Sequence, residues 1–296
     1  MRSRRRRAAG RATPTWASRS TASAPDRRAL FGFVQLEFGF LLGPADGRYL
    51  VRSHERGPAD AVLVLRTLGA PERRRLRARR PRSVERAEPE PVPTSRASVV
   101  RPEPFDSRGK ADAWLASLRR DEAAVEAELE AALRVLNRAL AAHRAAAAEP
   151  YAADVSAAHA LVARLGYGPG EAVADGRFVD AIELPPVAQR RRRRSMEARD
   201  ERFAAMLGGR EERLVAEELV LRARADLNAG RTREAALEAR IALEALIAEL
   251  GERAPRDQLE RVSAAANAAL EGRGADGVEE AVAAMEAAIR RRRLGA

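Results

Sequence analysis

The stretch LFGFVQLEFGFLLG (residues 30–43) alternates two sets of side chains along the chain. A period of two that is rich in aromatic residues predicts a β-strand, and this strand decides that the fold contains a sheet. One set of alternating positions is Phe31, Phe33, Gln35 and Glu37, and the other is Leu30, Val34, Leu36, Phe38 and Phe40.

The residues that follow predict further strands of the same sheet. PADG (44–47) has the composition of a turn, so RYLVR (48–52) is predicted to return beside the first strand as a hairpin. AVLVLRTLG (61–69) is almost continuously apolar, which is typical of a well-buried strand. ASVVR (97–101) is a candidate for one more strand.

Two more strands are predicted at 161–167 and 178–184, around a glycine-rich connection. The connection contains GYGPG (166–170), which a phosphate-binding loop could also contain. A phosphate loop needs a helix that begins at its end, and EAVADGRFV (171–179) contains another turn instead. The sequence therefore favours a hairpin loop.

One long amphipathic helix is predicted over residues 108–148, with Asp106 or Ser107 as its cap. The segment has no proline, and its leucines recur mainly at spacings of three and four, so the leucine stripe is expected to be buried. Pro150 is expected to stop the helix. A continuous helix of this length would span about 60 Å, which is longer than a small domain is wide, so it must extend beyond its own sheet or bend.

Residues 196–296 predict an all-α bundle, because five amphipathic segments are separated by short connections that contain glycine. LNAGRTREAALEARIALEAL (227–246) resembles the second half of a tetratricopeptide hairpin, and residues 270–289 have a similar pattern. The alternative is a plain alanine-rich bundle. The predicted helices are 196–207, 211–229, 232–250, 256–271 and 276–293.

Charge divides the chain into predicted ordered and disordered parts. The net charge is +11, yet residues 1–30, 71–101 and 184–195 alone carry +8, +6 and +5, which leaves the remainder at −8. We predict a disordered basic tail at 1–29, without the apolar segment of a secretory signal, and a solvated linker at 71–95.

The fold class follows as α+β: a small mixed or antiparallel sheet with one long helix, then the helical bundle. The sheet and long helix occupy residues 30–188, and an arginine-rich connector at 189–195 leads to the bundle.

Several classes of function have no candidate residues. The chain has no cysteine, which excludes disulfides, thiolate catalysis and cysteine-based metal sites. His54, His143 and His159 share no metal-ligand spacing, and no cofactor motif is present, so no cofactor is predicted. No apolar run approaches about 18 residues, so no membrane span is predicted and a cytoplasmic location is expected.

Three hypotheses for function follow. The first is a non-catalytic interaction or scaffold protein that binds another protein, or forms a homodimer, through helical surfaces. The second is a nucleic-acid-associated regulator with weak, non-specific affinity for polyanions. The third is an enzyme whose site in the sheet region has no recognisable motif, with Glu171 and Asp175 as its first residues to test. The possible polyanion contacts are Arg73, Arg74, Arg75, Arg190, Arg191, Arg192, Arg193 and Arg194.

Overall fold

A computed structural model describes residues 29–52, 57–69, 93–185 and 196–293. The predicted basic tail and the arginine-rich connector lie almost entirely outside these residues, as does most of the predicted linker. The end of that linker is instead part of a strand that begins at Thr94.

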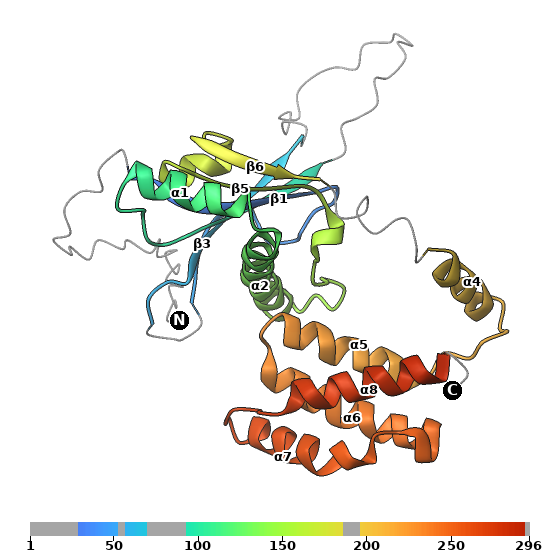
Figure 1. Cartoon of the computed structure of the whole chain (residues 1–296). Coiled ribbons are helices and arrows are strands. Elements are labelled where there is room, and N and C mark those ends of the chain that lie inside the picture. Colours follow the sequence, from blue (N-terminus) through green and yellow to red (C-terminus); the bar gives the residue numbers. More distant parts are fainter. Residues whose placement is uncertain (1–28, 53–56, 70–92, 186–195, 294–296) are drawn as a thin grey trace, which may run out of the picture.

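Six strands form one antiparallel sheet, so the α+β class is confirmed and the sheet is antiparallel (Figure 1). The order across the sheet is β2-β3-β4-β1-β5-β6. The strands are β1 (Phe31–Phe38), β2 (Gly47–Val51), β3 (Ala61–Leu68), β4 (Thr94–Val100), β5 (Ala160–Gly168) and β6 (Asp180–Leu184).

The first strand lies inside the sheet, and the predicted hairpin between it and residues 48–52 is wrong. β1 pairs with β4 on one edge and β5 on the other, while β2 pairs with β3 and with no other strand of the described residues. The reason is that β4 (seven residues) and β5 (nine residues) are longer than β2 (five residues), so they pair with more of the eight-residue β1. A turn sequence specifies a local reversal of the chain and leaves the strand pairing open.

Two helices replace the single predicted helix over 108–148: α1 (Arg108–Leu118) and α2 (Glu122–Ala147). The chain breaks between them because the Asp121 side chain accepts a hydrogen bond from the Ala124 amide at 3.1 Å, which caps a new helix. Ser107 caps α1 in the same way, as predicted.

Both helices cover one face of the sheet, and the predicted leucine stripe is buried there. Its buried members on α2 are Val125, Leu129, Leu136 and Leu140, and Leu133 is partly buried. They share a core with the sheet residues Val34, Leu36 and Phe38.

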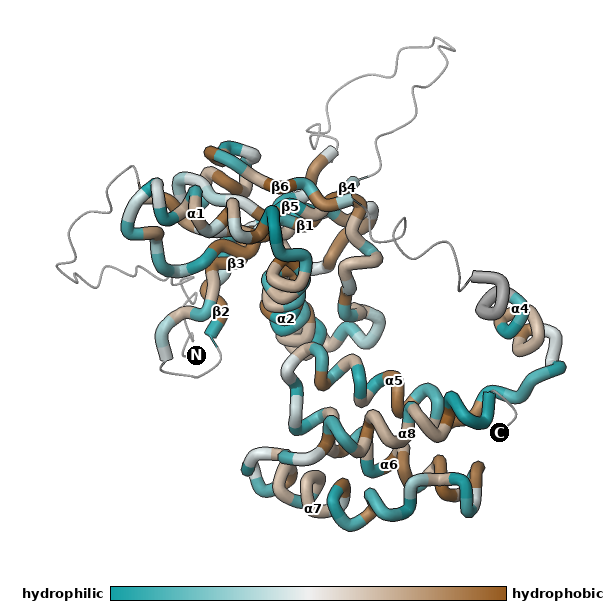
Figure 2. Tube along the Cα trace, viewed as in Figure 1, coloured by the Kyte–Doolittle hydropathy of each residue, from teal (hydrophilic) through white to brown (hydrophobic). Residues whose placement is uncertain are grey.

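The C-terminal helices form a second core. α5 (Val215–Asn228), α6 (Thr232–Leu250), α7 (Leu259–Leu270) and α8 (Val278–Arg293) all contribute buried residues to it. Figure 2 shows hydrophobic and hydrophilic positions alternating along these helices, as amphipathic packing requires. The helix α4 (Met196–Leu207) contributes none of the described core residues and lies to one side in Figure 1. Four of the five predicted helices therefore make the bundle core.

The apolar stripe of α6 is covered within the chain. Leu243 and Leu246 are fully buried in the bundle core, and Ile247 and Leu250 pack against it. These residues therefore need no second chain.

The resemblance to tetratricopeptide hairpins stays a prediction. None of the helices within the described ranges is both long and apolar enough to cross a membrane.

Truncating Leu136 tests the packing of α2 on the sheet. Leu136 is fully buried, so Leu136→Ala is expected to lower the free energy of unfolding by about 2–5 kcal/mol, as cavity-forming substitutions do. Leu221→Ala is the control: this side chain is 62% exposed, and a change of at most about 0.5 kcal/mol is expected. Urea unfolding followed by circular dichroism measures both, and equal effects would contradict the packing described.

Replacing Glu238 on α6 tests a pH dependence within the bundle. Burial raises the pKa of the Glu238 carboxyl, and the nearby Asp226 and Glu218 raise it further against the opposite effect of Arg222. The ionised form therefore destabilises the folded state, and this penalty is complete above the folded pKa. Glu238→Gln is expected to raise the melting temperature at pH 7, and the gain should disappear as the pH falls through that pKa. A pH-independent gain would contradict this cause.

Candidate functional site

A groove of about 860 Å³ runs along α2 between the sheet core and the bundle. Its other walls are the segment 154–160, the end of β6 at Leu184 and Pro185, and the carboxyl end of α5. A volume of a few hundred to about 1,000 Å³ is typical of binding pockets. Figure 1 shows α5 lying below α2 in this view.

Two parallel rows of side chains on α2 form the first wall. Val125, Leu129 and Leu133 make an apolar row at i, i+4 spacing, so they lie above one another on one face of the helix. Glu126 and Glu130 follow the same spacing one position further along and make an acidic row beside it. The groove therefore has an apolar floor and an acidic edge that come from the same helix.

The segment 154–160 forms the second wall and is held by one buried amide side chain. Asn137 of α2 is 8% exposed; its Nδ2 donates to the Val155 carbonyl at 2.9 Å, and its Oδ1 accepts from the Val155 amide at 2.8 Å. Both main-chain groups of Val155 are thereby satisfied without a strand partner. This pair of bonds fixes the distance between the second wall and α2.

Arg231, at the start of α6, joins the bundle to the second wall. Its guanidinium contacts the carboxylate of Asp154 and donates from Nε to Asp226 Oδ1 at 2.7 Å. Burial opposes the charge of Arg231, but the hydrogen bonds to Asp154 and Asp226 outweigh it and raise its pKa. The arginine stays charged, and it holds the end of α5 opposite α2.

The groove is acidic in a chain that is basic overall. Four carboxylates and one guanidinium line it, while the whole chain carries +11. Glu126 and Glu130 are exposed and have no ion-pair partner among the described residues, whereas Asp154 is paired with Arg231. The lining charges are Glu122, Glu126, Glu130, Asp154 and Arg134.

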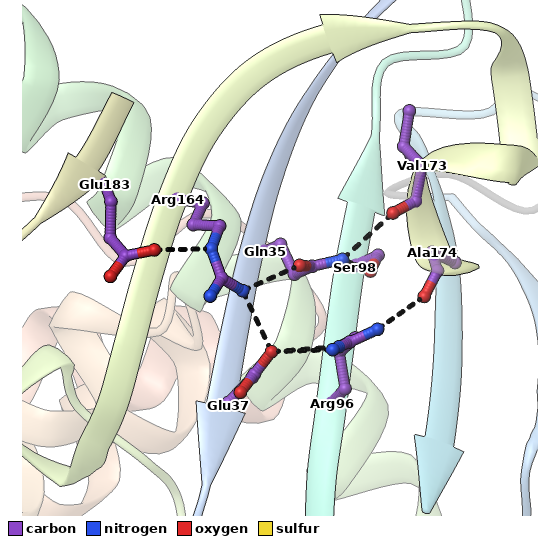
Figure 3. Close-up of polar contacts among 8 residues, drawn as sticks. All are labelled: Gln35, Glu37, Arg96, Ser98, Arg164, Val173, Ala174 and Glu183. Carbon is purple, nitrogen blue, oxygen red and sulfur yellow. Dashed lines mark hydrogen bonds and ion pairs between the residues drawn. The ribbon is translucent and has the colours of Figure 1, made fainter. Parts of the chain in front are cut away.

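A second polar cluster lies on the opposite face of the sheet (Figure 3). The Glu37 carboxylate accepts hydrogen bonds from Arg96 Nε at 3.0 Å and from Arg164 at 2.9 Å. Arg164 also donates to Glu183 at 2.8 Å. Partial burial works against the Arg164 charge, but the bonds to Glu183 and Glu37 raise its pKa overall.

This cluster attaches the short helix η2 (Gly170–Asp175) to the sheet. Gln35 donates to the Val173 carbonyl at 3.0 Å, and Arg96 donates to the Ala174 carbonyl at 3.2 Å. Gln35 also donates to Ser98 at 3.0 Å. Each of these side chains is engaged with its neighbours, so the cluster supports the fold and offers little to a ligand.

The residues singled out by sequence are not brought together. Arg73–Arg75 and Arg190–Arg194 lie outside the described residues. Glu171 and Asp175, the candidates for an enzyme, are half-exposed on η2 and face Arg48 at 2.7 Å and Arg66 at 3.9 Å. Within the described ranges, no three His, Asp or Glu side chains are arranged to hold a metal ion.

The acidic row on α2 is the signal in the sequence that could have indicated the groove. Glu122, Glu126 and Glu130 repeat at i, i+4 beside the leucine stripe, and like charges at this spacing destabilise an isolated helix. Comparisons of the chain with protein-family models, with curated proteins and with solved structures find no match.

Replacing Asn137 tests whether it holds the groove wall. Asn137→Ala leaves the Val155 amide and carbonyl without partners, and a loss of about 2–4 kcal/mol in the free energy of unfolding is expected. Hydrogen exchange at the Val155 amide should accelerate at the same time. The control is Asn228→Ala, an exposed lining residue, with a loss of at most about 0.5 kcal/mol. An unchanged Val155 exchange rate would show that another contact holds this wall.

Proposed function

We propose that this chain is a non-catalytic interaction protein of the cytoplasm whose α2 groove binds a segment of another protein chain. The observation that carries the proposal is the groove itself: an apolar row of Val125, Leu129 and Leu133 lines an open volume of about 860 Å³. An open volume next to apolar side chains, rimmed by charge, is the arrangement by which helical proteins accept a partner segment.

The two other hypotheses have less support from the described residues. The nucleic-acid hypothesis depends on arginines outside them, and an acidic groove repels phosphates. The enzyme hypothesis depends on Glu171 and Asp175, which face Arg48 and Arg66 as ion pairs on the surface. Neither hypothesis gives a role to the open volume beside α2.

Site-specific photo-cross-linking in the source cells tests the proposal. A benzophenone amino acid at position 158, which is exposed in the groove wall, is expected to cross-link a partner protein that mass spectrometry identifies. The control is the same amino acid at Ala123, which is exposed on α2 and does not line the groove. A cross-link to a second copy of this chain would show that the groove serves a homodimer.

A blocking variant then tests the identified partner with purified proteins. Ala158→Trp is expected to fill part of the groove and weaken binding about tenfold or more, because the partner loses its apolar contact area. Ala123→Trp adds the same side chain outside the groove and should leave the affinity unchanged. Equal affinities for the two variants, or equal cross-linking from positions 158 and 123, would refute the groove as the binding site.

A further inference from the structure

We propose that the segment bound in the α2 groove is a basic amphipathic helix, with lysines or arginines beside a narrow apolar stripe. This inference rests on the proposed function and adds the chemistry of the partner. It is carried by the spacing of the apolar row, by the uncompensated charge of the acidic row, and by the direction of α5.

The spacing of the apolar row favours a helical partner. Val125, Leu129 and Leu133 follow the i±4 line of α2, which is the ridge used in the commonest class of helix packing in globular proteins. The row spans nine residues, or about 12 Å along the helix axis, which corresponds to two to three turns of a partner. Val125 and Leu129 are each only 7% exposed, so the partner would contact their outer edges and the more exposed Leu133.

The acidic row favours a partner with positive charge. Glu126 and Glu130 are one turn apart, and like charges at this spacing destabilise a helix by a few tenths of a kcal/mol. Among the described residues neither carboxylate forms an ion pair: Arg134 lies one turn beyond Glu130 and also lines the groove, but it is not paired with it. Asp154 and Glu37, by contrast, are each paired with an arginine. A row of cations on a bound helix would relieve this repulsion, because each glutamate would then face a positive charge.

The end of α5 adds to the negative potential from the other side of the groove. Leu227 and Asn228, in its last turn, line the groove. The carboxyl end of a helix carries a partial negative charge, which stabilises cations nearby. Asp226 in the same turn is neutralised by Arg231, so the helix end and the row on α2 together act on an incoming basic residue.

Three synthetic peptides test this chemistry with the full-length chain. The first is an 18-residue helix with leucines at i, i+3, i+4 and i+7 and lysines elsewhere; the second has glutamates in place of the lysines; the third contains the lysines and leucines in scrambled order. Fluorescence anisotropy measures the dissociation constants at low and at moderate salt. Only the lysine helix is expected to bind measurably at low salt, despite the +11 charge of the chain, and binding should weaken at moderate salt.

Charge-removing variants locate the effect. Glu126→Gln with Glu130→Gln is expected to weaken binding of the lysine helix about five- to tenfold, because two solvent-exposed ion pairs are lost. Glu260→Gln with Glu280→Gln makes the same change in net charge on exposed positions of α7 and α8, and less than about a twofold effect is expected. Circular dichroism of both double variants checks that the fold is retained.

The outcomes separate this inference from the proposed function. If the glutamate helix binds as tightly as the lysine helix, or if the Glu126/Glu130 double variant binds normally, the partner is not basic, while inhibition by Ala158→Trp would still support the groove. If the scrambled lysine peptide binds equally, the attraction is non-specific and the inference is wrong. If Ala158→Trp leaves binding of every peptide unchanged, the groove does not bind peptides and both proposals fail.

Discussion

The position of the bundle beside the sheet depends on the contact between Arg231 and the two carboxylates of Asp154 and Asp226. Asp226 belongs to the bundle and Asp154 to the wall of the groove, so one guanidinium links segments 72 or more residues apart. Removing a buried partner from such a contact costs more than an exposed ion pair contributes, because the remaining charges stay desolvated. This contact ties the end of α5 to the segment 154–160, and Asn137 ties that segment to α2, so the groove lies among these three parts of the chain.

Periodicity was enough to predict most elements of the fold. The strand at 31–38, the buried strand at 61–68 and the C-terminal helices follow from apolar spacing alone. The spacing of apolar residues does not specify which strands pair with each other. The predicted placement of β2 beside β1 was therefore wrong, and β4, which begins at Thr94, occupies that edge of β1. The break before α2 was missed because Asp121 resembles any exposed helix residue until its side chain is seen to cap Ala124.

The groove was less predictable than the fold, because its walls come from four distant parts of the chain. Leu129 was correctly predicted to be buried, but its contact with an open volume depends on Val155 and Leu227, which no local pattern places opposite it. The arginines are conspicuous in the sequence because they form uninterrupted runs. Glu126 and Glu130 are separated by other residues, and their shared face is visible only once the helix is drawn.

The central position of β1 has a consequence for synthesis on the ribosome. Gln35 on β1 forms hydrogen bonds with Ser98 on β4, 63 residues later in the chain, and with Arg164 on β5, 129 residues later. The first strand to be synthesised is therefore paired on both edges only after β5 has been made. At translation rates of about 5–20 residues per second, β1 waits roughly 6–26 s for β5. During that time one edge of an aromatic-rich strand is open to other chains, which is the situation in which nascent proteins depend on chaperones.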